Sequence, residues 1–217
     1  MTNIVALSVG KEKEFLWREK AIVSAIGKTQ VKEVKLTVDG FVGDGVANPS
    51  FHGGPDRAVC YYPFEHYAKW EKEFNTKLKP PVFGENVCGT GFIEKDTYIG
   101  DIFSLGTAVV QITQGRIPCS TISQFNGINT FLPKIVETCL TGYFLRVLEE
   151  GIVREDSELQ LIERMQEEYN VLEATKIMLL DKKNYAAMEK LLLIPSLAED
   201  WRNRYQKAMS KLEKISE

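Results

Sequence analysis

The stretch Ala108-Val109-Val110-Gln111-Ile112-Thr113 is rich in Val, Ile and Thr, and Gln114-Gly115-Arg116-Ile117-Pro118-Cys119-Ser120 follows it directly. The first part is typical of a β-strand, and the glycine and proline of the second part end that strand. Cys119 is therefore predicted to lie in a loop at a strand end. Similar runs, many of them separated by glycine-containing turns, fill the first two-thirds of the chain and predict a mainly β fold.

Further strands are expected on both sides of this stretch. Val34, Leu36 and Val38 alternate with Lys35 and Thr37, as in a strand with one buried face. The expected strands cover residues 4–9, 21–26, 31–38, 58–62, 101–105 and 143–148. Two helices are expected among them, at residues 65–74 and 133–140.

The composition changes after about residue 155, where glycine almost disappears and helical spacing of apolar residues begins. One helix is expected from about Asn170 and a second at 185–192. A third is expected after Ser196 and Glu199, which fit a capping box. The sequence thus predicts a β domain at residues 1–155 and a three-helix domain at residues 156–217.

Composition excludes several classes of protein. The net charge of -3 argues against stable nucleic-acid binding, and no apolar run reaches the roughly 18–20 residues that span a bilayer. The first ten residues are expected to form a strand and not a signal peptide. Without an export signal, a cytoplasmic location with reduced cysteines is expected. With only two histidines and no Cys-x-x-Cys, a zinc site built from protein ligands alone is not expected.

The first candidate site is the cluster His52-Gly53-Gly54-Pro55-Asp56-Arg57, which follows Gly43-Asp44. Adjacent glycines let the backbone approach a ligand closely. Arg57 offers a planar set of donors for a phosphate or carboxylate, and His52 can exchange a proton near neutral pH. A tight turn with solvated charges explains the same residues equally well.

Two further clusters complete the set of candidates. Asn86, in Phe83-Gly84-Glu85-Asn86, carries a paired donor and acceptor that can bind a heterocycle edge or simply cap a loop. Arg116 beside Cys119 favours the thiolate form of that cysteine, and thiolates bind soft or redox-active metals. Cys60 and Cys139 are interpreted instead as buried small apolar residues, while Cys88 remains ambiguous.

In this order, the three clusters resemble the MOSC domain, named for the C-terminal part of molybdenum-cofactor sulfurase. The matching segments are Gly43-Asp44, His52 to Val59 with Tyr62-Pro63, Phe83 to Asn86, Arg116 to Cys119 and Gly142 to Leu148. The resemblance covers about residues 1–155. The helical tail resembles the three-helix extension of the stand-alone bacterial subfamily that confers resistance to hydroxylaminopurine.

The resemblance implies a barrel-like β fold and a molybdenum cofactor, a molybdopterin whose metal takes one protein ligand, Cys119. It further implies an oxidoreductase that reduces N-hydroxylated bases or amidoximes to amines, with electrons from a separate reductase. The expected cofactor contacts are Gly53, Gly54, Arg57, Asn86, Gln114, Arg116 and Ser120. His52 and Asp56 are expected to position a proton for the leaving oxygen.

Two other functions remain open from the sequence. Cys119 could carry a persulfide and pass sulfur to an acceptor, which is also a task for a thiolate. The chain could instead store the cofactor or bind a partner through its helical tail. Molybdenum and pterin content, measured against labile sulfur, would separate these alternatives.

Overall fold

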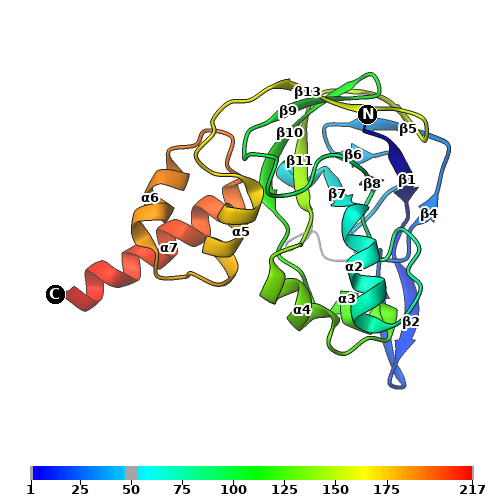
Figure 1. Ribbon diagram of the computed structural model, residues 1–217, viewed down its shortest axis with the longest axis horizontal. Helices are drawn as coiled ribbons and strands as arrows, with labels where there is room; N and C mark the ends of the chain where they lie inside the picture. The colour runs from blue at the N-terminus through cyan, green and yellow to red at the C-terminus, as the bar shows by residue number, and fades with distance from the viewer. Residues whose placement is uncertain (1, 47–52, 217) are drawn as a thin grey trace.

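A computed structural model describes residues 2–46 and 53–216, with side chains up to Lys211. Its centre is an eight-stranded sheet in the order β13-β9-β10-β11-β7-β8-β1-β4 (Figure 1). The strands are β1 (Ile4–Val9), β4 (Thr29–Gln30), β7 (Val59–Pro63), β8 (Val87–Gly89), β9 (Ile102–Leu105), β10 (Ala108–Gly115), β11 (Tyr143–Glu149) and β13 (Leu159–Glu163). Neighbouring strands are antiparallel except β7 and β8, which run parallel.

The mainly β class is confirmed, but the sheet is open where a barrel was expected. A barrel needs every strand to have two neighbours, and in the described part of the chain β13 and β4 are the edges. The Thr2 hydroxyl donates a hydrogen bond to the Leu159 carbonyl, so the start of the chain reaches β13 without forming a ladder with it. The structure is therefore a curved sheet that approaches a barrel but does not close.

Two smaller sheets flank the large one. The first contains β12 (Gly151–Arg154), β5 (Glu33–Thr37) and β6 (Gly40–Phe41) in that order. The second is a hairpin of β2 (Lys13–Trp17) and β3 (Lys20–Ser24), which projects from the body beside α3 (Figure 1). Most side chains of this hairpin are exposed, and Leu16 is 72% exposed.

All the expected strands are present within a few residues, and the sheet also continues beyond residue 155. β13 pairs with β9 through Leu159 to Glu163, so the boundary between strands and helices falls after Glu163. The short strands β2, β4, β6, β8, β12 and β13 and the helix α3 were not expected. The four shortest of these strands carry too few residues for a period of two to stand out.

Three helices follow the strands that build the candidate site: α2 (Glu65–Phe74), α3 (Thr121–Asn126) and α4 (Phe131–Thr138). The helix expected at residues 65–74 is confirmed to the residue, and α4 replaces the helix expected at 133–140. Trp70, Phe83 and Phe131 form part of an aromatic core that joins these helices to β7 and β8. This core fixes the loop that follows β10 against the sheet.

The C-terminal helices are α5 (Val171–Leu179), α6 (Tyr185–Leu192) and α7 (Glu199–Ser216), as the helical spacing predicted (Figure 1). Asn170 caps α5 by accepting a hydrogen bond from the Glu173 amide at 2.8 Å. Trp201 and Tyr205 of α7 are fully buried in the same core as Ile112 and Leu145 of the sheet. The three helices and the sheet therefore share one hydrophobic core.

Gly115, at the end of β10, allows this close packing. A Cβ at this position would lie 1.9 Å from Thr175 Oγ1 and 3.3 Å from the Trp201 ring. Thr175 belongs to α5 and is fully buried. Only glycine lets the strand and helices approach so closely, directly before the loop that carries Arg116 and Cys119.

The start of α7 differs from the predicted capping box. Ser196 is buried, and its hydroxyl has no hydrogen-bond partner among the described residues. The first helical amide, of Glu199, instead donates to Asp56 Oδ2 at 2.8 Å. An acid distant in sequence therefore supplies the cap, which local spacing could not reveal.

In the described ranges, no helix has both the length and the apolar character needed to cross a membrane. The four cysteines, all within those ranges, form no disulfide. Cys60, Cys88 and Cys139 are buried, and Cys119 is half-buried.

Candidate functional site

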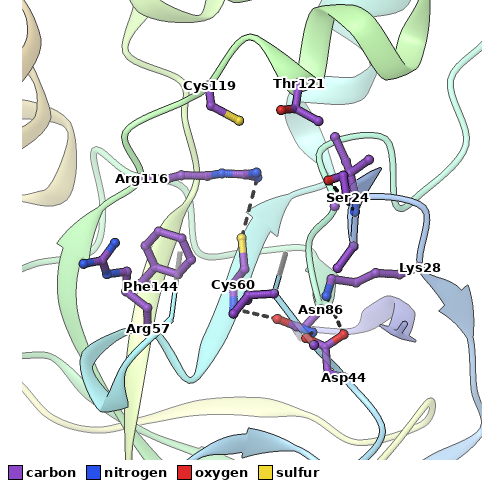
Figure 2. A pocket seen from close by; sticks show the side chains of 15 residues that line it. Ser24, Lys28, Asp44, Arg57, Cys60, Asn86, Arg116, Cys119, Thr121 and Phe144 are labelled. Atoms are coloured by element: carbon purple, nitrogen blue, oxygen red, sulfur yellow. Dashed lines mark hydrogen bonds and ion pairs between the residues drawn. The ribbon is translucent and has the colours of Figure 1, made fainter. Parts of the chain in front are cut away.

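A pocket opens between the end of β3, the turn after β6, β7 and the loop that joins β10 to α3 (Figure 2). Its cavity volume is about 100 Å³. The side chains that line it and are labelled in Figure 2 are Ser24, Lys28, Asp44, Arg57, Cys60, Asn86, Arg116, Cys119, Thr121 and Phe144. Segments from most of the β domain therefore meet at one place.

Cys119 reaches the pocket because the chain leaves the sheet after Gly115. Pro118 lacks a backbone N–H, which favours a loop at this position. The Cys119 carbonyl accepts a hydrogen bond from the Ile122 amide at 3.2 Å, which ties this loop to the first turn of α3. The cysteine is held on a short connection between two fixed elements.

Arg116 crosses the pocket between Cys119 and Cys60 (Figure 2). Its Nη1 donates to the Phe83 carbonyl at 2.5 Å and lies 3.7 Å from Cys60 Sγ. Burial raises the pKa of the Cys60 thiol, although the nearby Arg116 guanidinium acts in the opposite direction. Cys60 therefore remains a thiol that contacts the arginine.

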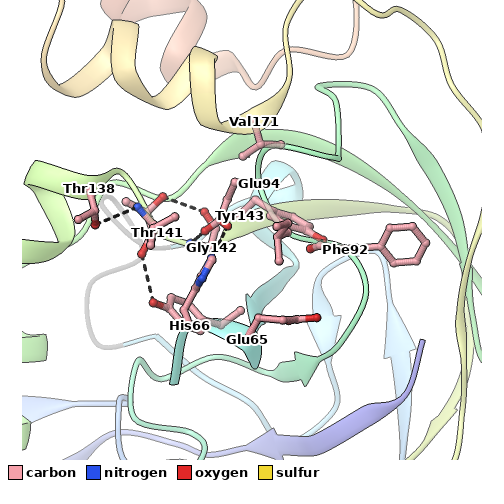
Figure 3. A network of polar contacts seen from close by, with 12 residues as sticks. Glu65, His66, Phe92, Glu94, Thr138, Thr141, Gly142, Tyr143 and Val171 are labelled. Atoms are coloured by element: carbon pink, nitrogen blue, oxygen red, sulfur yellow. Dashed lines mark hydrogen bonds and ion pairs between the residues drawn. The ribbon is translucent and has the colours of Figure 1, made fainter. Parts of the chain in front are cut away.

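A buried polar network around His66, Glu94 and Gly142 (Figure 3) is connected to the backbone of Arg116. The Arg116 amide donates to the Gly142 carbonyl at 3.0 Å, and the Gly142 amide donates to Glu94 Oε1 at 2.8 Å. Glu94 Oε2 lies 2.6 Å from His66 Nε2, and Glu94 is fully buried. The strand end that carries Arg116 is thus fixed by hydrogen bonds on its far side.

The opposite wall holds an ion pair between Lys28 and Asp44. The Lys28 ammonium donates to Asp44 Oδ1, and only 6% of the lysine side chain is exposed. Asp44 also accepts from the Gly10 amide and from Asn86 Nδ2, each at 2.8 Å. Asn86 Oδ1 accepts from the Cys60 amide at 3.0 Å. The Asn86 side chain is therefore engaged by protein groups on both its donor and its acceptor.

Arg57 enters from the short 3-10 helix η1 (Pro55–Arg57). The Arg57 amide donates to the Gly54 carbonyl at 2.9 Å, and Gly54 has a φ of 103° that disfavours other residues. Arg57 Nη2 lies 3.9 Å from Asp200 Oδ2 of α7. Among the described residues, the pocket is lined by three cations, Lys28, Arg57 and Arg116, and by one carboxylate, Asp44.

The structure brings together four of the expected site residues: Arg57, Asn86, Arg116 and Cys119. Gly53, Gly54, Asp56, Gln114 and Ser120 do not line this pocket. His52 lies outside the described residues, so its expected role stays a prediction.

Two of the residues outside the pocket have clear alternative partners. Asp56 Oδ1 pairs with Arg146 at 2.8 Å, in addition to capping α7. Gln114 is buried, and its amide donates to the Gly115 carbonyl at 3.2 Å, while its Oε1 has no partner among the described residues. The two carboxylate oxygens of Asp56 therefore connect β11 of the sheet to the start of α7.

The sequence did not single out Lys28, Ser24, Thr121 or Phe144 as site residues. Lys28 lies in Gly27-Lys28-Thr29, between β3 and β4, and no local pattern connects it to Cys119. Asp44 was noted only for its place beside Gly43. These residues become neighbours through the sheet order, which a single sequence does not specify.

Chemically, the pocket suits an anionic ligand that also needs one thiol. Arginine and lysine side chains bind phosphate through charge-assisted hydrogen bonds. In the described part of the chain, no group of three or more His, Cys, Asp or Glu side chains is arranged to hold a metal ion.

Comparison with known proteins shows the family to which this chain is related. Residues 48–160 match the MOSC domain model, and residues 171–209 match the "YiiM-like, 3-alpha helix domain". The chain is 38% identical to the uncharacterized protein YflK of Bacillus subtilis strain 168 over 211 residues, 97% of this chain and 96% of that one. It is 37% identical to the protein YiiM of Escherichia coli strain K12 over 191 residues, 85% of this chain and 84% of that one.

The fold also matches a solved structure. The crystal structure of YiiM from Geobacillus stearothermophilus superposes with a TM-score of 0.81 and 31% identity, covering 96% of this chain and 99% of that one. A longer chain named "Reductase" from Gibberella moniliformis strain M3125 is 31% identical over 166 residues, 72% of this chain but 28% of that one.

Proposed function

Because the chain belongs to the MOSC domain family and carries the YiiM-like three-helix domain, we propose that it is a molybdenum-cofactor-dependent reductase of N-hydroxylated compounds. The family is associated with the molybdenum cofactor and includes reductases that depend on it. The proposal extends this to the present chain, to the reaction and to the residues that carry it.

The observation that supports the proposal most directly is the pairing of Cys119 with three cations in one pocket. The dithiolene of a molybdopterin supplies most of the metal's ligands, so one protein thiolate is enough. The phosphate of the same cofactor needs cationic donors, which Lys28, Arg57 and Arg116 provide. The donor set of the pocket therefore fits the cofactor, with Cys119 as the metal ligand.

The remaining pocket residues have supporting roles in this proposal. Asn86 was expected to bind the pterin edge, but its amide already joins Asp44 to Cys60. We therefore assign Asn86 to holding the Lys28–Asp44 pair in place. Phe144 lines the pocket beside Arg57 and offers an apolar surface to a bound heterocycle (Figure 2).

The proposed reaction consumes two electrons and two protons: R–NH–OH becomes R–NH2, the N–O bond breaks, and the oxygen leaves as water. When bound, the molybdenum cofactor supplies the two-electron redox chemistry. Electrons are proposed to come from a separate reductase.

The test compares protein made in a host that produces the cofactor with protein made in a host that cannot. We expect loaded protein to contain molybdenum and pterin in equal amounts and to reduce 6-N-hydroxylaminopurine with an artificial electron donor. Unloaded protein should fold, because the two hydrophobic clusters of the core are built from apolar side chains of the chain itself, but it should be inactive. The loaded form should melt at a higher temperature, since a ligand that binds the native state stabilises it.

Three outcomes contradict the proposal. Labile sulfur on Cys119 without molybdenum would favour the sulfur carrier. Molybdenum and pterin without turnover would favour a storage role. Equal reduction rates in loaded and unloaded protein would exclude molybdenum chemistry. Loaded Cys60→Ser serves as the control for Cys119→Ser, because both remove a pocket thiol and only Cys119 is assigned to the metal.

A further inference from the structure

We infer that the start of α7 positions Arg57 in the pocket, with Asp200 acting on the guanidinium and Asp56 holding the turn that carries it. Asp56 and Asp200 are then positioning residues, and the three-helix domain supports the Arg57 wall of the pocket from outside, since no residue after Phe144 is among the described residues that line it. The inference rests on the proposed function, in which Arg57 binds the cofactor phosphate. It also gives Asp56 a role different from the proton transfer that the sequence predicted.

Asp56 fixes the turn η1 at three points. Its Oδ2 accepts from the Glu199 amide at 2.8 Å, and its Oδ1 pairs with Arg146 of β11 at 2.8 Å. Its carbonyl accepts from Thr113 Oγ1 of β10 at 2.7 Å. The residue before Arg57 is thus bound to α7, β10 and β11 at once.

The turn itself supplies little rigidity. η1 has three residues, none of them buried, and it follows Gly54 with its positive φ. A short 3-10 turn has poor hydrogen-bond geometry, so contacts with the rest of the fold matter for its position. The three contacts of Asp56 therefore tie this turn to α7, β10 and β11.

Asp200 then acts on the Arg57 side chain. Arg57 Nη2 and Asp200 Oδ2 are 3.9 Å apart, with side chains 13% and 26% exposed. The Ala198 amide donates to the Thr113 carbonyl at 3.0 Å, which anchors the first turn of α7 to β10. The carboxylate that faces Arg57 is therefore carried by a fixed helix end.

Whether Asp200 strengthens or weakens anion binding in the pocket depends on its second partner, Arg204. Arg204 Nε donates to the same Oδ2 at 2.9 Å, closer than Arg57. Arg204 therefore offsets much of the Asp200 charge, and Asp200 costs the pocket little of its positive potential. The orienting effect on a long, flexible arginine should then exceed the electrostatic gain from removing Asp200.

The experiment is a double-mutant cycle between Asp200 and Arg57. Asp200→Asn, Arg57→Ala and the double variant are compared with Glu199→Gln. This control removes one negative charge from the neighbouring residue, whose backbone N–H donates to Asp56 and whose side chain makes no hydrogen bond or ion pair with the described residues. Two quantities are measured: pterin retained after dialysis of protein from a cofactor-producing host, and the inorganic phosphate concentration that raises the melting temperature of cofactor-free protein. The second does not depend on activity.

We expect Asp200→Asn to weaken phosphate binding by roughly two- to fivefold, the range of a partly exposed ion pair, and to lower pterin retention. Glu199→Gln should match the wild type, and Asp200→Asn should have no further effect in the Arg57→Ala background. Unchanged or tighter phosphate binding in Asp200→Asn overturns the inference, as does an equal loss in the Arg57→Ala background. Wild-type protein without pterin overturns the proposed function instead, and the phosphate measurements then decide the inference by the same criteria.

Discussion

Replacing Gly115 by alanine tests whether the three-helix domain and the sheet are packed as one unit. The new Cβ would lie 1.9 Å from Thr175 Oγ1 and 3.2 Å from Thr175 Cβ. An ordinary contact needs about 3.4 Å or more, so strand and helix must separate or Thr175 must turn away. Thr175 is fully buried and donates to the Val171 carbonyl at 2.7 Å, so turning away also breaks a hydrogen bond.

The expected cost combines these two effects. Overpacking a core costs about 1–3 kcal/mol, and loss of the hydrogen bond adds about 1 kcal/mol. Gly115→Ala should therefore lower the free energy of unfolding by about 2–4 kcal/mol. In a chain of this size each kcal/mol corresponds to about 2–4 °C in the melting temperature. The change should be read by urea unfolding and by calorimetry on cofactor-free protein.

A matched pair of variants makes the result decisive. Gly45→Ala is the control, because its Cβ would meet no atom closer than 3.5 Å. Thr175→Ala removes Oγ1, the atom with the closest contact, so the double variant Gly115→Ala/Thr175→Ala should be more stable than the sum of the single effects by about 1 kcal/mol or more. Gly115→Ala with wild-type stability, or a strictly additive double variant, would refute the packing described for this interface.

Three further predictions concern the pocket and its surroundings. Cys119→Ser should abolish reduction of the substrate with little change in melting temperature. Cys60→Ser should instead lower the free energy of unfolding by about 1 kcal/mol, because it buries a more polar group. Turnover assays measure the first effect and unfolding curves the second. Arg116→Ala should reduce pterin retention after dialysis, and Arg116→Lys should restore it only in part, because lysine lacks the planar donors; full retention in both variants would remove Arg116 from the phosphate site. Burial raises the pKa of Glu85 in the folded protein. As the pH rises above about 4.5, the unfolded chain loses this proton while the folded protein still holds it, so the free energy of unfolding should fall. The stability difference between wild type and Glu85→Gln, measured by urea unfolding from pH 4 to 8, should therefore shrink toward low pH, and a constant difference would contradict this.

Local sequence was sufficient for the parts of the protein that are built from neighbouring residues. Apolar runs such as 108–113 predicted the strands, and the spacing of Trp201 and Tyr205 predicted a helix that buries them, as it does. Arg116 and Cys119 were placed together because three positions along one loop cannot lie far apart. The three clusters, in their order along the chain, also led to the MOSC family, which the comparisons confirm.

Tertiary structure alone decided how these segments meet. Lys28, Asp44 and Asn86 lie in three separate segments, and only the order of strands in the sheet brings them to one wall of the pocket. Asp56 caps α7 although Ser196 was the better local candidate, because a buried helix end takes whichever oxygen the fold places beside its amides. The open edge of the sheet has the same cause: hydrogen bonds between distant strands determine closure, and the pattern within a single strand does not record them.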